Sequence, residues 1–258
     1  MKEKKINLII YRLSAMGDVS MMVPLILALK QEYKDIKITV VSNVFFMPFF
    51  QTIDSVDFIG IDTSNKHKGF WGIFKIFKEI YTIRPTHFAD LHSSLRSRII
   101  ILLLKFSRVK SFSLDKGRGE KKALVRVENK IFKPLQHTLS RYQDVLQRLG
   151  FKLNLEKPNF LIQEKIPEKY TKFFNKDFKT IGIAPFAKHE AKIYPLRLMQ
   201  KVIDQLAQNK ENFIFLLGGK NELEALYSLK GLHTNVLVVD CSFKEELALI
   251  SNLSVMLS

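Results

Sequence analysis

The stretch Ile6-Asn-Leu-Ile-Ile-Tyr-Arg-Leu-Ser-Ala-Met-Gly-Asp-Val19 decides the fold of this 258-residue chain. Its short run of large apolar residues is typical of a strand that is buried on both faces of a sheet. Gly17 allows a tight turn after this strand, and the residues from Val19 to Tyr33 then follow a helical pattern. A buried strand, a turn and a helix in this order indicate the first unit of a parallel α/β sheet.

The same alternation continues along the chain and defines two sets of elements. In the first set we expect strands at Lys37–Ser42, Phe58–Asp62, Thr86–Leu91 and Val109–Ser113, and helices over 70–81, Leu95–Phe106 and Leu139–Leu149. In the second set we expect strands at Thr180–Ala184, Phe213–Leu217 and Val236–Asp240, helices at Pro195–Gln208, Glu222–Lys230 and Lys244–Asn252, and the start of a further strand at Val255.

These two sets predict an α/β protein with two Rossmann-like parallel-sheet domains, residues 1–165 and 166–258. The segments Lys152–Pro158 and Glu164–Pro167, rich in Lys, Asn and Pro, join them. The second set has three complete strands, whereas a doubly wound sheet usually has five or six. We therefore predict that the second domain is incomplete and that the sequence is truncated at its C-terminal end.

Asp18 is the first candidate for chemistry, because it follows the first strand at the sheet edge where α/β proteins bind their ligands. A carboxylate there can act as a base, but aspartate is also one of the residues preferred at a helix N-cap. Both interpretations remain open from the spacing alone. The turn lacks the G-x-G-x-x-G pattern, and the chain has no P-loop Gly-Lys-Ser/Thr, so dinucleotide-dependent hydride transfer and P-loop NTPase chemistry lose support.

Two further clusters follow strands of the second set. Lys188 and Lys192 lie in a basic loop just before the helix expected at Pro195, and cations beside a helix N-terminus are suited to a pyrophosphate. A solvated loop explains the same lysines without a ligand. Gly218-Gly219 with Glu222 comes after the next strand, where Glu222 can cap a helix or accept hydrogen bonds from a ribose.

The charge of the chain predicts an acidic partner. Its 41 Lys and Arg exceed its 25 Asp and Glu, and 14 of these cations against four acids lie between Arg96 and Arg148. We expect a loop at Gly117 and Gly119 in the middle of this basic segment. The asymmetry of charge favours an anionic ligand or membrane surface. Few aromatic residues accompany it after Phe112, which disfavours single-stranded nucleic acid. Over residues 70–81 one helix face is apolar, and it is either a core face, which we favour, or a face that contacts a bilayer. This face comprises Phe70, Ile73, Phe74, Phe77, Ile80 and Tyr81.

Five motifs in order along the chain resemble those of glycosyltransferase family 9, the ADP-heptose:lipopolysaccharide heptosyltransferases. They are Arg12-Leu-Ser-Ala-Met-Gly-Asp-Val with Pro24-Leu and Ala28-Leu, Asp90-Leu-His-Ser-Ser-Leu-Arg96-Ser, His137 with Arg141-Tyr142, Lys192-Ile-Tyr-Pro195, and Gly218-Gly219 with Glu222. No single motif is specific, whereas five in register are. The resemblance implies a GT-B fold, with the acceptor bound by the first domain and a nucleotide-sugar by the second.

The resemblance also implies roles for individual residues. Asp18 takes the place of the catalytic base, Lys192 that of a lysine on the donor diphosphate, and Glu222 that of an acid near the donor ribose. Ser14 and Gly17 line the loop of Asp18, and we assign them to the acceptor together with Arg96, Arg118 and Arg141. Lys188, Gly218 and Gly219 complete the donor set. The family's donor segment that follows the strand beginning at Val255 is missing from this sequence.

The resemblance implies that a sugar, heptose in the first instance, moves from an ADP-sugar to an anionic lipid-linked inner-core saccharide of lipopolysaccharide, with inversion. The lysines neutralise the diphosphate, so we expect no metal and no further cofactor. With Cys241 as its one cysteine, the chain fits a reducing cytoplasmic location, with peripheral contact to the inner membrane and no nucleic-acid partner. The alternative is a non-catalytic basic α/β binding module, or an inactive truncated remnant, that binds anionic lipid or nucleic acid.

Overall fold

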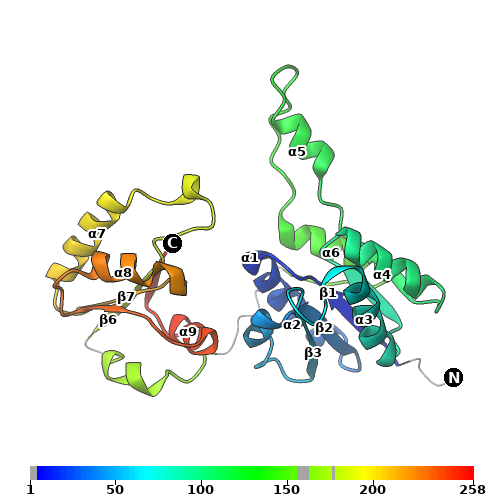
Figure 1. The fold of residues 1–258 in the computed structure, drawn as a ribbon, viewed down its shortest axis with the longest axis horizontal. Helices are drawn as coiled ribbons and strands as arrows, with labels where there is room; N and C mark the ends of the chain where they lie inside the picture. The colour runs from blue at the N-terminus through cyan, green and yellow to red at the C-terminus, as the bar shows by residue number, and fades with distance from the viewer. Residues whose placement is uncertain (1–4, 156–162, 176–177) are drawn as a thin grey trace. The chain divides into compact units, whose positions relative to one another are not determined.

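The computed structural model describes residues 5–155, 163–175 and 178–258. The chain divides into two compact units, residues 1–161 and residues 162–258. Each unit is a parallel sheet flanked by helices, which confirms the predicted α/β class (Figure 1). Of the predicted linker, residues 156–158 lie outside the described part of the chain.

The first unit is built on a five-stranded sheet in the order β3-β2-β1-β4-β5, and all of its strand pairs are parallel. Its strands are β1 (Asn7–Tyr11), β2 (Lys37–Asn43), β3 (Val56–Ile61), β4 (His87–Asp90) and β5 (Lys110–Ser113). The opening strand β1 lies in the centre, where Leu8 is paired with Ile38 on one side and with His87 on the other. Each of these strands was expected within a few residues.

Helices cover both faces of β1, because its residues are buried alternately to either side. Ile9 and Tyr11 share a core cluster with Ile73 of α3 and Ile100 of α4. Leu8 and Ile10, which are also buried, point to the opposite face. The helices of this unit are α1 (Met16–Ser20), α2 (Met22–Glu32), α3 (Gly69–Thr82), α4 (Leu95–Lys105), α5 (Arg118–Leu124) and α6 (Thr138–Leu149), with a 3-10 helix at Val44–Phe49.

The second unit contains a four-stranded parallel sheet in the order β8-β7-β6-β9. Its strands are β6 (Lys179–Ile183), β7 (Asn212–Leu216), β8 (Val236–Val238) and β9 (Val255–Leu257). Its helices are α7 (Leu196–Gln208), α8 (Leu223–Lys230) and α9 (Phe243–Ile250), with 3-10 helices at Glu168–Phe173, Glu190–Lys192 and Lys220–Glu222. The strand predicted to begin at Val255 is therefore present, paired with β6. Pro195 is the N-cap of α7 and not its first residue.

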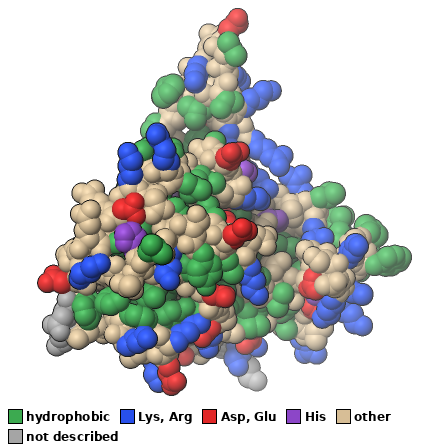
Figure 2. Space-filling model, turned by 60° about the vertical axis from the view of Figure 1, so that its left-hand side comes forward, with side chains coloured by type: hydrophobic (Ala, Val, Ile, Leu, Met, Phe, Trp, Pro, Cys, Tyr) green, Lys and Arg blue, Asp and Glu red, His purple; other side chains and the backbone are tan. Residues whose placement is uncertain are grey.

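Two local predictions are wrong. The helix expected from Val19 begins at Met16 and is divided at Met21, which ends α1 and precedes α2. Gly17 therefore lies inside a helix and forms no tight turn. The basic segment after β5, expected as a loop, contains α5, which projects away from the sheet (Figures 1 and 2). Gly117 begins α5 with a φ of 58°, and a Cβ at this position would lie 2.4 Å from the Arg141 guanidinium.

Candidate functional site

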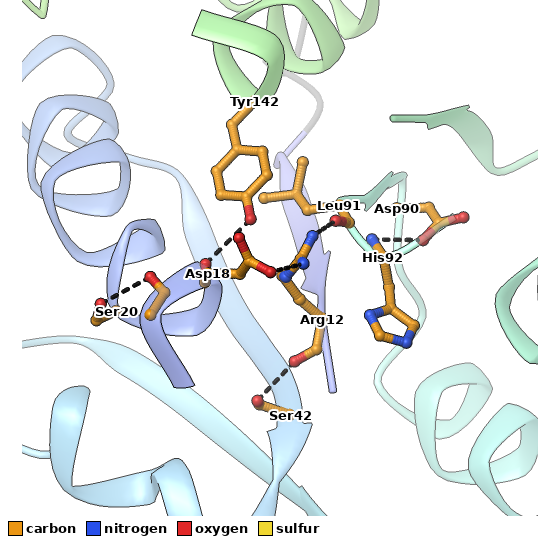
Figure 3. Close-up of polar contacts among 9 residues, drawn as sticks. Arg12, Asp18, Ser20, Ser42, Asp90, Leu91, His92 and Tyr142 are labelled. Atoms are coloured by element: carbon orange, nitrogen blue, oxygen red, sulfur yellow. Dashed lines mark hydrogen bonds and ion pairs between the residues drawn. The ribbon is translucent and has the colours of Figure 1, made fainter. Parts of the chain in front are cut away.

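The carboxyl ends of β1 and β4 bring together the polar residues of the first unit. Tyr11 is paired with Asp90 at the last position of both strands, so the residues that follow, Arg12 and Leu91, emerge side by side. The Arg12 Nη1 donates a hydrogen bond to the Leu91 carbonyl oxygen. Figure 3 shows the resulting cluster, in which Asp18, Arg12 and Tyr142 meet.

Asp18 is held by contacts to both its carboxylate and its main chain. Its Oδ2 accepts a charged hydrogen bond from the Arg12 Nη2, and its main-chain oxygen accepts one from the Tyr142 hydroxyl at 3.0 Å (Figure 3). The N-cap of α1 is Ala15, and α2 follows Met21, so Asp18 caps neither helix. The capping interpretation is therefore wrong. The side chain of Asp18 remains 40% exposed, which leaves the carboxylate accessible from solvent.

Arg12 is buried to a degree that is unusual for a charged side chain, with 10% of it exposed. A buried cation is stable only when it is paired and hydrogen-bonded. The guanidinium meets this need through Asp18 and Leu91, and it lies 5.6 Å from the centre of the Tyr142 ring. The Ser42 hydroxyl donates to the Arg12 main-chain oxygen at 2.6 Å and so fixes the backbone. Arg12 therefore holds one oxygen of Asp18 in a defined place.

Tyr142 links this cluster to α6, which packs against α2. Burial raises the pKa of the Tyr142 hydroxyl, with Arg12 acting in the opposite direction, so the hydroxyl stays protonated and remains a donor. Tyr142 and Asp18 are separated by 124 residues in the sequence. Local sequence patterns give no sign of such a contact, although both residues belong to motifs that the resemblance picks out.

Asp90 is a structural residue at this edge of the sheet. Its carboxylate is fully buried and accepts hydrogen bonds from the main-chain nitrogens of His92 at 3.0 Å and Ser93 at 2.8 Å. It also accepts one from the Ser113 hydroxyl at 2.9 Å, which joins the ends of β4 and β5. Asp90 thereby shapes the turn that presents His92 beside the Tyr11 ring.

His92 is kept neutral by its surroundings. Burial lowers its pKa, and the neighbouring Arg12 and Lys116 cations lower it further. In the unfolded chain the pKa returns to its ordinary value near 6.5. As the pH falls below this value, the unfolded chain takes up a proton that the folded chain does not bind, so stability decreases.

We expect the His92→Gln variant to lose part of this pH dependence. Glutamine keeps a polar side chain of similar size and does not titrate. Between pH 7 and pH 5 the melting temperature of the wild type should fall by a few degrees more than that of the variant. Thermal unfolding followed by circular dichroism measures both slopes. Equal slopes would show that His92 does not contribute.

The other residues predicted to contact the acceptor occupy different surroundings. Ser14 and Gly17 are exposed in the turn and first helix after β1. Arg96 lies on α4 near the Tyr11 hydroxyl, whose pKa is raised by burial while the Arg96 charge opposes the shift. Arg118 is exposed at the start of α5. Their contact with an acceptor stays a prediction.

Arg141 is largely buried and is held by other residues of the first unit. Its side chain is 9% exposed, and Nη2 donates to the Glu120 Oε2 at 2.7 Å. It also donates to the main-chain oxygens of Gln136 at 3.1 Å and Asp115 at 3.3 Å. These bonds attach the α5 segment to α6, so the present partners of Arg141 are all within the chain.

Lys116 is a candidate that the sequence analysis did not single out. It lies between the end of β5 and α5, and burial together with the nearby cations Arg118 and Arg12 lowers its pKa. Cations that crowd one another in this way are favourable sites for an anion. Lys116 could not be singled out from the sequence, because it is one of many charged residues in this segment. The sequence does not show which of these lysines lies close to Arg12.

In the second unit, the predicted donor residues follow the carboxyl ends of the adjacent strands β6 and β7. Lys188 and Lys192 are exposed in the segment after β6, and Gly218 and Gly219 follow β7. The Glu222 Oε2 accepts a hydrogen bond from the Gly219 main-chain nitrogen at 2.6 Å, which is the capping role that the sequence allowed. A role of Glu222 at a ribose, and the convergence of Asp18 and Lys192 on one cleft, stay predictions.

Among the residues that the structure describes, no three side chains of His, Cys, Asp and Glu gather as they would around a metal ion. In the same residues no helix combines the length and the apolar character needed to cross a membrane.

Comparison with known proteins identifies one family and several similar structures. The model of glycosyltransferase family 9 (heptosyltransferase) matches residues 73–258. None of the curated protein sequences matches. A family 9 glycosyl transferase from Veillonella parvula has a similar structure, with a TM-score of 0.75 at 17% identity over 99% of this chain and 76% of its own.

Two E. coli structures are similar as well. Heptosyltransferase WaaC with ADP gives a TM-score of 0.71 at 16% identity, over 97% of this chain and 80% of its own. ADP-heptose lps heptosyltransferase II gives a TM-score of 0.64 at 17% identity, over 97% of this chain and 78% of its own. At such identities these likenesses establish the fold, which is the GT-B arrangement of two parallel-sheet domains.

Proposed function

The chain belongs to glycosyltransferase family 9, and from this premise we propose that it transfers a sugar from an ADP-sugar, with heptose favoured, to an anionic lipid-linked saccharide. The similar structures of heptosyltransferase WaaC with ADP and of ADP-heptose lps heptosyltransferase II support this choice of donor. We further propose that the transfer inverts the anomeric centre, with Asp18 as the base. This would be the chemistry of a single displacement by an acceptor hydroxyl.

The observation that carries the proposal is the arrangement of Asp18. Its carboxylate is paired with the Arg12 guanidinium, yet it is partly exposed at the carboxyl edge of the sheet. A base must reach the acceptor hydroxyl and be free to take its proton. Since Arg12 binds Oδ2, the second carboxylate oxygen is the one that we assign to the acceptor. As the proton moves to Asp18, the hydroxyl oxygen bonds to the anomeric carbon, and the bond from that carbon to the diphosphate oxygen breaks.

The leaving diphosphate takes the electron pair of the broken bond and gains negative charge. Positive groups placed where this charge develops accelerate the reaction. Lys188 and Lys192 are exposed at the carboxyl edge of the second sheet and supply such groups. Gly218 and Gly219 at the neighbouring strand end would allow close approach of the nucleotide backbone, because they carry no side chain.

On the acceptor side the proposal rests on the cations that follow the carboxyl ends of β4 and β5. Lys116, Arg96 and Arg118 belong to a segment with few acids, and Lys116 is close enough to Arg12 and Arg118 for their charges to lower its pKa. Phosphate and carboxylate groups of a lipid-linked saccharide would relieve this repulsion. We assign Arg141 a positioning role here, through the bonds by which it holds the α5 segment.

We expect ADP to stabilise the wild type and to stabilise the Lys192→Ala variant much less. A ligand at 100 times its Kd stabilises the folded state by about 2.7 kcal/mol, which a thermal shift detects easily. Losing one charge-assisted contact to the diphosphate should weaken ADP binding roughly 10-fold or more. The measurement is the melting temperature as a function of ADP concentration.

The matched control is Lys210→Ala. Lys210 is also an exposed lysine of the second unit, but it precedes β7 and so lies at the opposite edge of that sheet. Its removal should leave the ADP shift unchanged. Equal shifts for wild type and Lys192→Ala would refute the role of Lys192. A shift with an oligonucleotide and none with ADP or ADP-sugars would refute the transferase and support a nucleic-acid-binding module.

A further inference from the structure

Helix α3 has two apolar faces, and the structure buries one of them. Ile73, Ile76 and Ile80 pack into the core cluster against the sheet. The expected core packing is thus confirmed for Ile73 and Ile80 but wrong for Phe70, Phe74 and Tyr81, which are exposed. Trp71, the only tryptophan of the chain, is 76% exposed beside them.

Three exposed aromatic side chains at the start of α3, Phe70, Trp71 and Phe74, form one contiguous group. The ring centres of Phe70 and Phe74 are 5.2 Å apart, and those of Trp71 and Phe74 are 5.9 Å apart. Lys75 and Lys78 lie four and seven residues after Trp71, so the helical repeat places them on the same side of α3. Both lysines are exposed.

Helix α4 continues this surface. It packs beside α3, and Ile100 and Leu104 belong to the same core cluster, so the outer sides of both helices face away from the same side of the sheet (Figure 1). Its outer residues alternate between apolar and basic. The α3–α4 surface comprises the exposed apolar residues Phe70, Trp71, Phe74, Tyr81, Leu95, Leu102 and Phe106 and the exposed cations Lys75, Lys78, Arg98 and Lys105.

The charge around this surface has one sign. Residues 66–108 hold nine Lys and Arg and two acids, Glu79 and Asp90. Asp90 is fully buried at the end of β4, and Glu79 is paired with His67 and Lys66. Neither acid therefore neutralises the outer cations of α3 and α4.

We propose that the α3–α4 surface binds the surface of an anionic lipid bilayer. Aromatic side chains are favoured at the boundary between lipid and water, and Lys and Arg extend their charges to anionic headgroups. An apolar group with surrounding cations on an amphipathic helix is the pattern of a helix that lies in this interface. A second copy of the chain fits less well, because two such surfaces would bring like charges together. Nucleic acid fits less well too. Its bases would need free aromatic rings to stack on, whereas the rings of α3 contact one another and the aliphatic side chains of α4 cannot stack with a base.

Trp71 provides a direct test in the unmodified chain. With vesicles of phosphatidylglycerol and phosphatidylcholine, we expect its fluorescence to move to shorter wavelength and to be quenched by brominated lipid. With phosphatidylcholine alone, or at high salt, the change should be much smaller, since headgroup attraction is then absent or screened. No change with anionic vesicles would overturn the proposal. A fluorescence change that depends on protein concentration in the absence of lipid would indicate self-association and would also overturn the proposal. A fluorescence change caused only by an oligonucleotide would overturn it as well.

Variants locate the contact by vesicle co-sedimentation. Phe70→Ser with Phe74→Ser should weaken partition roughly 10- to 100-fold, because two large apolar side chains no longer enter the interface. Lys75→Glu with Lys78→Glu should weaken it about 30-fold or more on anionic vesicles. All four side chains are exposed, so the fold should be retained, as an unchanged melting temperature would show.

The matched control is Val127→Ser with Phe132→Ser in the segment after α5, which removes two apolar side chains that are even more exposed than Phe70 and Phe74. We expect it to partition like the wild type. Loss of partition in this control, with none in the Phe70 and Phe74 variant, would place the contact in the segment after α5 and overturn the proposal. Partition needs no turnover, so its outcome is independent of sugar transfer and of Asp18.

Discussion

The Asp18→Asn variant is expected to bind ADP and the donor as the wild type does and to transfer sugar about 10²- to 10⁴-fold more slowly. General-base catalysis by a positioned side chain contributes an effect of this size. Asparagine keeps the shape of Asp18 and an oxygen that can accept from Arg12, but it cannot take a proton from the acceptor. The rate of ADP release in the presence of acceptor measures sugar transfer, and the Kd for ADP measures binding of the nucleotide. Together the two measurements separate transfer from binding.

Asp57→Asn is the matched control for this variant. It makes the same chemical change at an exposed residue of β3, whose carboxylate is 3.1 Å from the Lys37 amine. Transfer by this control should be unchanged. Wild-type transfer by Asp18→Asn would mean that the carboxylate is not the base. Because Asp18 caps no helix, a slow variant cannot be attributed to loss of a cap.

Removing the partner of Asp18 is expected to have the second-largest effect. Arg12→Ala should lower kcat by about 10- to 100-fold and destabilise the first unit by about 2–4 kcal/mol. Breaking this partly buried charge pair removes the Arg12 contacts of the Leu91 carbonyl and of one carboxylate oxygen. Urea unfolding and steady-state kinetics measure the two effects.

Arg12→Lys distinguishes positioning from stability. Lysine restores the charge, but its single ammonium group cannot reach Asp18 and Leu91 with the planar geometry of a guanidinium. We expect stability to recover more than kcat, while the KM for the donor stays near that of the wild type. In the double variant with Asp18→Asn, the loss in kcat should be less than additive, because both changes act on one contact. Full additivity would show that Arg12 does not act through Asp18.

The positions of the strands along the chain could be predicted because the central strands β1, β2, β6 and β7 are buried on both faces. Continuous apolar runs such as Leu8–Tyr11 are long enough to be recognised and are separated by helical patterns. The expected position of Val255 in a strand rested on the same regularity. Strands and helices of this kind depend on residues that are close together in the sequence, so the sequence pattern is enough to predict them.

The start of α1 and the formation of α5 could not be predicted, because they depend on distant contacts. Asp18 is fixed by Tyr142, and α5 is held to α6 by the pair of Glu120 and Arg141. The outer face of α3 was misjudged for a different reason. A helix that is apolar on two sides has no periodicity that shows which side is covered.

The central place of β1 has a consequence for biosynthesis. Its partner residues on β4 are made about 80 residues later, since Leu8 pairs with His87. At 5–20 residues per second on the ribosome, one edge of this largely apolar strand lacks its neighbour β4 for roughly 4–16 s. During that interval the nascent chain exposes a segment that chaperones recognise, so the yield of folded protein should depend on how quickly translation reaches β4.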